Sequence, residues 1–348
     1  MKTVFVTGGC GFIGSNFVRL LATSTDYRIV NFDKLTYAGN LENVADISPA
    51  RMRFVHGDIC DRDLVERTLA EEKPWAVVNF AAESHVDRSI LDSTPFLHTN
   101  IGGVQSLLEA VRRVSVERFL QISTDEVYGD KAGKLPSTED SPLAPSSPYS
   151  ASKAAADLLC FSYRRTYGLP ILLTRSSNNY GSYQFPEKLI PLLLRNGLGD
   201  LDFPVYGDGQ QIRDWIHVED NCLGLLAVLE KGEIGSIYNI GTSEERSNLA
   251  VVEAICAAIA AYKSVDLRQL TERIRYVTDR PGHDRRYALD TSKVRKTLGW
   301  APRVDFPGGL QRTVHWYLDN AHWVARVTSG EYRQYYESVY AQSWGKKL

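Results

Sequence analysis

The chain has 348 residues, of which 43% are hydrophobic and 24% are charged; this is the composition of an ordinary globular protein and excludes a disordered or fibrous one. The net charge of −2 gives no reason to expect a nucleic-acid partner, and because no apolar run reaches about 18 residues, we expect no membrane span. The five scattered cysteines favour a reducing compartment, the cytoplasm, over a disulfide scaffold, and no metal site is predicted. An apolar strand directly after Lys2 predicts that there is no signal peptide.

The first predicted unit is a strand, a glycine turn and a helix. Thr3 to Thr7 is a short β-branched and aromatic run, which is typical of a buried strand. Gly8, Gly11 and Gly14 follow it, ahead of a helical pattern of apolar residues. Glycines let the backbone approach a pyrophosphate, whose charge is met by the helix N-terminus. The turn therefore predicts a dinucleotide-phosphate site, and the alternative is a purely structural turn.

The second strand, Arg28 to Phe32, is closed by Asp33. An acid about 20 residues beyond such a glycine turn can accept hydrogen bonds from the adenosine ribose. It would repel a 2′-phosphate, so Asp33 favours NAD over NADP, although the neighbouring Lys34 weakens this preference. In the alternative interpretation Asp33 only caps a turn.

Two further strands are predicted at Met52 to His56 and Trp75 to Phe80. Asp58 follows the first of them and either contacts the adenine or caps the next helix. His85 follows the second and is either catalytic or an ordinary loop residue. A long helix is then predicted from Phe96 to Val114.

The fifth strand, Arg118 to Ile122, leads into Thr124 and two adjacent acids, Asp125 and Glu126. An open parallel sheet places its ligand crevice just beyond the carboxyl ends of its strands. Two carboxyls at one reacting centre can act as acid and base if their surroundings push their pKa values apart. The alternative is that they belong to a solvated loop or a helix N-terminus.

Tyr149 and Lys153 lie four residues apart at the start of a helix predicted from Ser150 to Tyr167. This spacing puts both side chains on one face. The lysine could lower the pKa of the tyrosine and hold a ribose, which would make Tyr149 a usable base. The alternative is a surface pair.

Beyond the sixth strand, Ile171 to Arg175, strand and helix alternate less regularly. Arg213 and Arg280 suit phosphate recognition, because a guanidinium pairs bidentately with phosphate oxygens; surface salt bridges are the alternative. The aromatic segment from Tyr332 to Trp344 is predicted to serve packing. The alternation predicts an α/β fold, a Rossmann-type doubly wound parallel sheet with a smaller mixed α/β C-terminal part.

The glycine turn from Thr7 to Gly14 and the Tyr149-x-x-x-Lys153 pair together resemble the extended short-chain dehydrogenase/reductase superfamily. Within it, the chain is similar to the dTDP-glucose 4,6-dehydratase family, above all in Thr124-Asp125-Glu126, because sugar epimerases of the superfamily generally lack the paired acids. The similar segments are 33–40, 81–88, 123–129, 177–181, 185–191, 210–215 and 279–284. No motif position departs from the pattern.

The resemblance implies a role for each matching residue. It implies an NAD-binding domain over residues 1–176, to which parts of the later chain return, and a nucleotide-sugar-binding domain over residues 177–348. The residues implied to bind NAD are Gly8, Gly11, Phe12, Ile13, Gly14, Asp33, Lys34, Thr36, Asp58, Ile59, Ala81, Thr99, Tyr149, Lys153 and Asn179. Those implied to bind the nucleotide sugar are Ser84, Thr124, Asn178, Glu187, Lys188, Leu189, Pro204, Val205, Tyr206, Arg213, Asn248, Arg280 and His283. The implied catalytic residues are Thr124, Asp125, Glu126, Tyr149 and Lys153.

The resemblance also implies the reaction, in which dTDP-glucose becomes dTDP-4-keto-6-deoxyglucose and water. Tyr149 takes the 4-hydroxyl proton while C4 gives hydride to NAD. Glu126 then removes the C5 proton, Asp125 protonates the departing 6-hydroxyl, and hydride returns to C6. UDP- or CDP-hexose 4,6-dehydration and nucleotide-sugar epimerisation stay open as alternatives.

Extended relatives commonly dimerise through two helices of each subunit. Here these would be the helices over about 96–114 and 149–167, which predicts a homodimer with a four-helix contact. Leu107, Val111, Leu158 and Phe161 either form that contact or face their own core.

Overall fold

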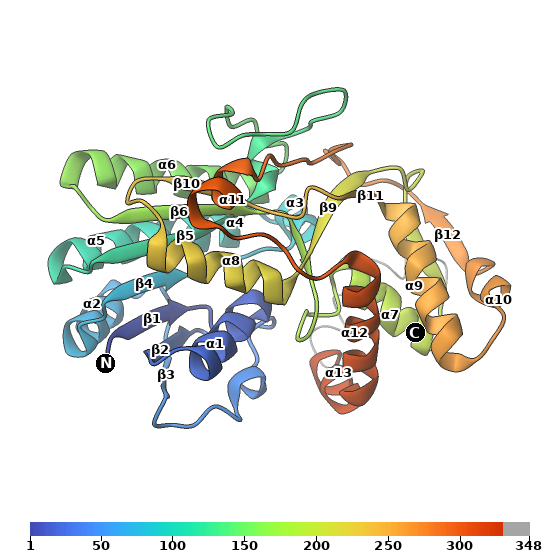
Figure 1. Cartoon of the computed structure of the whole chain (residues 1–348), viewed down its shortest axis with the longest axis horizontal. Helices are drawn as coiled ribbons and strands as arrows, with labels where there is room; N and C mark the ends of the chain where they lie inside the picture. Colours follow the sequence, from blue (N-terminus) through green and yellow to red (C-terminus); the bar gives the residue numbers. More distant parts are fainter. Residues whose placement is uncertain (330–348) are drawn as a thin grey trace.

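A seven-stranded parallel sheet organises the protein (Figure 1). The structure, a computed structural model, describes residues 1–329, so the segment from Tyr332 to Trp344 lies outside the described residues. The strand order is β10-β6-β5-β4-β1-β2-β3, and all six neighbouring pairs are parallel. These strands are β1 (Thr3–Thr7), β2 (Arg28–Asp33), β3 (Met52–His56), β4 (Ala76–Asn79), β5 (Arg118–Thr124), β6 (Ile171–Ser176) and β10 (Ile237–Ile240). The doubly wound prediction is confirmed, and the six strands predicted up to residue 175 agree within two residues at each end.

Both faces of the sheet are covered by helices, which is why its strands are continuous apolar runs. Successive side chains of β1 point to opposite faces: Val4 and Val6 enter one core and Phe5 the other. The first core is closed by α1 (Phe12–Ser24), α8 (Val218–Lys231) and α11 (Ser292–Leu298). The second is closed by α2 (Arg62–Glu72), α5 (Val104–Val114) and α6 (Pro148–Tyr167).

A separate apolar core, which includes Tyr180, Phe203 and Ile255, lies in the later part of the chain. The elements of this core lie toward the right of Figure 1, whereas the large sheet lies toward the left. Its strands are β7 (Asn178–Tyr180), β8 (Phe203–Tyr206), β9 (Ile212–His217), β11 (Glu245–Ser247) and β12 (Ile274–Val277). Its helices are α7 (Leu189–Leu198), α9 (Asn248–Lys263), α10 (Leu267–Thr271), α12 (Phe306–Asp319) and α13 (Ala321–Val327). α8, β10 and α11 come after residue 177 but pack with the large sheet; the domain boundary at residue 176 stays a prediction.

The predicted helix from Phe96 to Val114 is not regular. It consists of α4 (Thr94–Phe96), a π-helical segment η2 (Leu97–Gly103) and α5. Apolar periodicity could not reveal the π-helix, because a change from i→i+4 to i→i+5 bonding leaves the residue types unchanged. Such segments are frequent at functional sites. The remaining short helices are η1 (Leu41–Val44), α3 (Val86–Leu91) and η3 (Asp125–Tyr128).

The glycine turn after β1 is fixed by close backbone approach. Gly8 has a φ of +67°, and its N–H donates to the carbonyl oxygen of Phe32 over 2.9 Å. A Cβ at Gly14 would stand 2.1 Å from the carbonyl oxygen of Gly8, so only glycine lets α1 begin this close to the strand.

Over residues 1–329, no helix is long and apolar enough to cross a membrane.

Gly14→Ala should lower the free energy of unfolding by about 1–3 kcal/mol, the usual cost of forcing an extra methyl group into a packed site. Urea denaturation measures this change. Gly102→Ala is the matched control, because this second helical glycine has nothing within 4 Å of its would-be Cβ. The control should be neutral or stabilising by about 0.5–1 kcal/mol. Equal destabilisation by both variants would contradict the packing argument.

Candidate active site

A cavity of about 320 Å³ opens beyond the carboxyl ends of β1, β4, β5 and β6. This is where a doubly wound sheet places its ligand. All fifteen residues predicted to bind the cofactor line this cavity, and so do Thr124, Asp125, Glu126, Tyr149 and Lys153. Chain segments that are far apart in the sequence therefore meet at one edge of the sheet, as the strand-end argument requires.

The predicted sugar-binding residues divide into two groups. Ser84, Thr124, Asn178, Glu187 and Lys188 line the cavity. The eight that are not among its lining residues are Leu189, Pro204, Val205, Tyr206, Arg213, Asn248, Arg280 and His283. In this second group, Tyr206 Oη and Arg280 Nη1 each lie 3.3 Å from a carboxylate oxygen of Asp87, and the Tyr206 and His283 ring centroids are 6.2 Å apart. Pro204 and Val205 are buried in β8, and Asn248 begins α9.

The two acids form the start of the helix η3, where Asp125 is buried and Glu126 is half-buried at the cavity. Thr124 caps this helix, since its Oγ1 accepts from the N–H of Glu126 over 3.3 Å. Asp125 is only 3% exposed. Its Oδ1 accepts from Thr124 Oγ1 over 3.2 Å, whereas its buried Oδ2 has no hydrogen-bond partner within residues 1–329. The solvated-loop interpretation was wrong for Asp125; the helix-terminus interpretation was right and is compatible with chemistry.

Neighbouring charges act differently on the pKa values of Asp125 and Glu126. Burial, and then the charge of Glu126, raise the pKa of Asp125 to about 8, with Arg213 opposing this rise. Burial also raises the pKa of Glu126, but Arg280, Arg213 and Lys188 all oppose that rise. Asp125 is thus suited to hold a proton at neutral pH, and Glu126 is the better supported carboxylate.

Tyr149 and Lys153 lie on the first two turns of α6. The helix begins with a capping box between Ser147 and Ser150 and with Pro148 in its first turn. Lys153 Nζ donates to the carbonyl oxygen of Ile122 over 2.7 Å, and both predicted residues are buried, so the surface-pair alternative is wrong.

The predicted lowering of the tyrosine pKa by the lysine is not what this structure gives. Burial, and then the charge of Glu126, raise the pKa of Tyr149, while a hydrogen bond with Thr124 works in the opposite direction. Burial lowers the pKa of Lys153, and Asp157 partly restores it. The nearby carboxylate and the desolvation therefore outweigh the lysine in the ligand-free chain.

Asp33 both caps a turn and faces the cavity. Its Oδ2 accepts from the N–H of Cys10 and its Oδ1 from the N–H of Leu35, each over 2.8 Å. The turn-capping role is thus observed, and it is compatible with the predicted ribose contact, because a carboxylate has about four lone-pair sites. Burial raises the pKa of Asp33 and these two backbone hydrogen bonds oppose the rise.

Asp58 does not cap the following helix, because Asp61 does so by accepting from the N–H of Leu64 over 3.1 Å. Asp58 instead lies 2.7 Å from Lys34 Nζ at the rim of the cavity. His85 is the buried N-cap of α3 and so is not an ordinary loop residue; its catalytic role stays a prediction. Burial lowers the pKa of His85.

Comparison with known proteins identifies the family. The profile of the GDP-mannose 4,6 dehydratase family matches residues 5–313. The dTDP-glucose 4,6-dehydratase of Xanthomonas campestris pv. campestris (strain B100) is 53% identical over 346 residues, 96% of this chain and 98% of that protein. This chain belongs to the dTDP-glucose 4,6-dehydratase family.

Solved structures agree with this membership. The family member from Streptomyces venezuelae, solved with NAD and TYD bound, is 46% identical with a TM-score of 0.87, over 94% of this chain and all of that one. UDP-glucose 4-epimerase of Thermotoga maritima reaches a TM-score of 0.84 at 27% identity, over 92% of this chain and all of that one. The fold is thus common to the family and to epimerases, and the sequence separates them.

Several residues that line the cavity were missed by the sequence argument. Glu83 follows the end of β4, so the strand-end rule could have found it; Ser177 lies in the segment 177–181, which the sequence predicts to be a polar binding loop, and it also lines the cavity. Gln184 and Phe185 line the cavity from the later part of the chain. No local pattern marks them, because their place depends on how the second core meets the sheet.

Asp125→Asn should stabilise the ligand-free protein by an amount that grows from about pH 4 to about pH 8 and is constant above. The folded pKa of Asp125 is about 8 and its ordinary value is 3.8. Between these values the unfolded chain has lost a proton that the native one retains, so this carboxyl makes stability fall as pH rises. Denaturant unfolding across that range measures the effect.

Asp208→Asn is the control of opposite sign. Hydrogen bonding with Arg285 lowers the pKa of the exposed Asp208, so its stabilisation is present above its unfolded pKa and fades as pH falls. That variant should be no more stable than the wild type at neutral pH. A pH-independent effect of Asp125→Asn would rule out a proton held on the native carboxyl.

Proposed function

We propose that this chain is a lyase of deoxysugar biosynthesis that converts dTDP-glucose to dTDP-4-keto-6-deoxyglucose and water, and that NAD is regenerated in every cycle. The observation that carries the proposal is the pair of adjacent acids, the buried Asp125 and the half-buried Glu126, in the same cavity as Tyr149. A redox or epimerising enzyme has no elimination step that would need them.

The cavity fits NAD. α1 begins after Gly11, so the N–H groups of its first turn face no capping side chain and suit a pyrophosphate. The close approaches at Gly8 and Gly14 leave no side chain in the way. Asp33 suits a free ribose 2′-hydroxyl. When bound, NAD supplies the hydride acceptor and donor.

Tyr149 and its neighbours would handle the first proton. Tyr149 Oη takes the proton of the sugar 4-hydroxyl as C4 loses hydride, and Thr124 is close enough to hydrogen-bond with the tyrosine. The ammonium of Lys153, oriented by the carbonyl oxygen of Ile122, favours the tyrosinate form of Tyr149 that accepts this proton, and the transfer leaves a neutral phenol. The 4-ketone that results makes the C5 proton acidic.

Glu126 and Asp125 then act as the base and the acid of the elimination. Glu126 removes the C5 proton, a C5–C6 double bond forms, and the 6-hydroxyl leaves as water with a proton from Asp125. The assignment of base and acid follows from the three cations that oppose the rise of the Glu126 pKa and from the value of about 8 for Asp125. Transfer of hydride to C6 and return of the proton from Glu126 to C5 complete the product.

We assign the diphosphate end of the sugar nucleotide to Arg213 and Arg280. Both act electrostatically on Glu126, which supports a phosphate position near the reacting acids. Arg213 Nη2 donates to the carbonyl oxygen of Asp284 over 2.9 Å, which orients its guanidinium. Ser84, Asn178 and Lys188 would contact the substrate from the cavity wall.

The nucleotide preference is tested by measuring turnover of dTDP-, UDP-, CDP- and GDP-hexoses and analysing each reaction for the 4-keto-6-deoxy product.

Asp125→Asn and Glu126→Gln should each lower product formation by about 10²–10⁴-fold, the usual contribution of a general acid or base. Both variants keep the shape of the side chain, so binding of NAD and dTDP-glucose, and oxidation at C4, should survive. Tyr149→Phe should instead prevent the absorbance of reduced nicotinamide from appearing. Stopped-flow absorbance and product analysis measure the two steps.

Asp140→Asn is the matched control, an exposed acid on the loop after η3, and it should keep full turnover. Near-normal product formation by the Asp125→Asn, Glu126→Gln double variant would contradict the dehydratase mechanism.

We also propose a cytoplasmic homodimer whose contact is built on α6 and on the outward side of η2 and α5. Leu107 and Val111 cannot form it, because both are buried in the core beneath α5. Leu158 on α6 supports the proposal, since this apolar side chain is 59% exposed, and the half-buried Phe161 lies on the same helix.

Leu158→Lys should give a monomer in sedimentation at micromolar concentration, because the contact would have to bury an unpaired ammonium group. Leu135→Lys is the matched control: this leucine is 86% exposed on the loop that precedes α6, and its variant should stay dimeric. A wild-type protein that sediments as a monomer would refute the dimer outright.

A further inference from the structure

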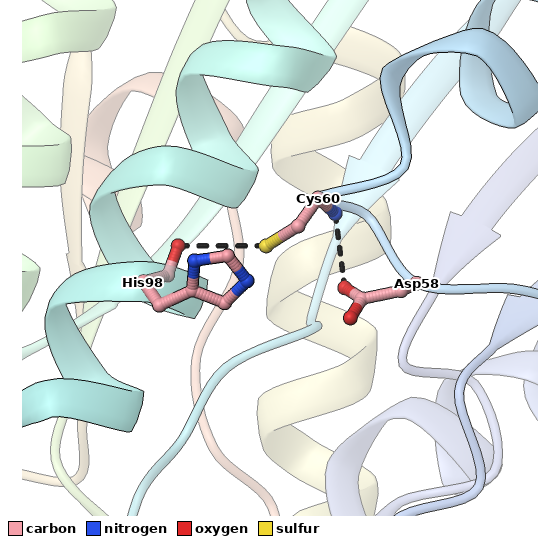
Figure 2. A group of neighbouring side chains, drawn as sticks. All are labelled: Asp58, Cys60 and His98. Carbon is pink, nitrogen blue, oxygen red and sulfur yellow. Dashed lines mark hydrogen bonds between the residues drawn. The ribbon is translucent and has the colours of Figure 1, made fainter.

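Three side chains of different chemistry, Asp58, Cys60 and His98, converge beside the cavity (Figure 2). One ligand atom from each lies within 4.8 Å of the other two. The proposed reaction gives no role to Cys60 or His98. Cys60 is also the one cysteine of the five that is partly accessible, since Cys10, Cys160, Cys222 and Cys256 are buried.

Local structure holds the three side chains together. Asp58 Oδ1 accepts from the backbone N–H of Cys60 over 2.9 Å, which fixes the loop between β3 and α2. Cys60 Sγ donates to the carbonyl oxygen of His98 over 3.4 Å, and this bond joins that loop to the π-helix η2. Gly103 permits the approach of this loop, because a Cβ there would lie 2.4 Å from Ile59 Cδ1 and 3.3 Å from the sulfur of Cys60.

We propose that Asp58, Cys60 and His98 form a binding site for a divalent cation of the zinc class. A thiolate, an imidazole and a carboxylate are the ligands that Zn²⁺ prefers, with water in the fourth tetrahedral position. Binding replaces the thiol proton of Cys60, which passes to solvent, and the sulfur turns from the carbonyl oxygen of His98 to the metal.

Lys34 is the competitor that the metal must displace, because its Nζ lies 2.7 Å from Asp58 Oδ2. Its side chain is 54% exposed and can move. Glu83, which lines the same cavity, already acts electrostatically on Lys34. Lys34 therefore has a second carboxylate to approach when the metal takes Asp58.

The site should antagonise the cofactor. This step rests on the proposed function, in which Asp58, Ile59 and Thr99 hold the adenosine end of NAD. Asp58 and Ile59 share a loop with Cys60, and Thr99 follows His98 directly in η2. A metal that draws these ligands together removes the Asp58 carboxylate from the cavity. NAD must weaken metal binding by the same factor as the metal weakens NAD binding.

The first experiment reads the metal alone. Cofactor-free protein is titrated with Co²⁺, whose thiolate-to-metal charge-transfer absorption reports a bond to sulfur, and Zn²⁺ is added to displace it. We expect one Co²⁺ per chain, with the absorption lost in Cys60→Ser. His98→Gln should weaken binding by at least roughly tenfold, since even residues that only orient a metal ligand cost 10–100-fold. His315→Gln, an exposed histidine on α12, should bind like the wild type.

The second experiment measures the dissociation constant of NAD by calorimetry with and without saturating Zn²⁺. Zn²⁺ should raise it in the wild type and not in Cys60→Ser, which should keep ordinary turnover. Absence of the charge-transfer absorption, or equal binding by wild type, Cys60→Ser and His98→Gln, overturns the site. An unchanged NAD affinity at full metal occupancy overturns the antagonism. Failure of the protein to bind NAD at all would refute the proposed function while the cobalt result still decides the metal site.

Discussion

Desolvation of two adjacent carboxyls at the end of β5 is the constraint on which the site depends. An isolated buried carboxylate is costly, and such a group regains its proton unless charges or hydrogen bonds support it. Asp125 is 3% exposed, and its pKa rises to about 8. The same burial makes the pair chemically useful. It favours a proton on Asp125, whereas nearby cations favour the charged form of Glu126.

Those cations come from outside the large sheet. Lys188 immediately precedes α7, Arg213 lies in β9, and Arg280 follows β12. All three oppose the rise of the Glu126 pKa. The elements that carry them belong to the part of the protein with its own apolar core. The second part therefore does more than cover a ligand, since its packing against the sheet brings cations that oppose the rise in the pKa of Glu126.

The large sheet contributes a site that can serve several reactions. The glycine turn and the buried Tyr149 and Lys153 belong to the doubly wound part of the fold, and the fold as a whole is shared with an epimerase of 27% identity. Function is decided by what is placed on such a scaffold. Here the addition is the Thr124-capped turn of η3, which holds both acids against the same cavity.

The sequence by itself determined the strands of the large sheet up to residue 175, the glycine turn and the places of Asp33, Tyr149 and Lys153, because strand periodicity, close backbone approach and i,i+4 spacing are local properties. Only the tertiary structure decided that Asp61, not Asp58, caps α2, that Leu107 faces its own core and that η2 is π-helical. It also decided the pKa direction of Tyr149, since local spacing showed Lys153 but not the burial and the Glu126 charge that outweigh it. Hydrogen-bond partners, burial and long-range charge depend on which distant segments meet, and that information lies in the packing of the two cores.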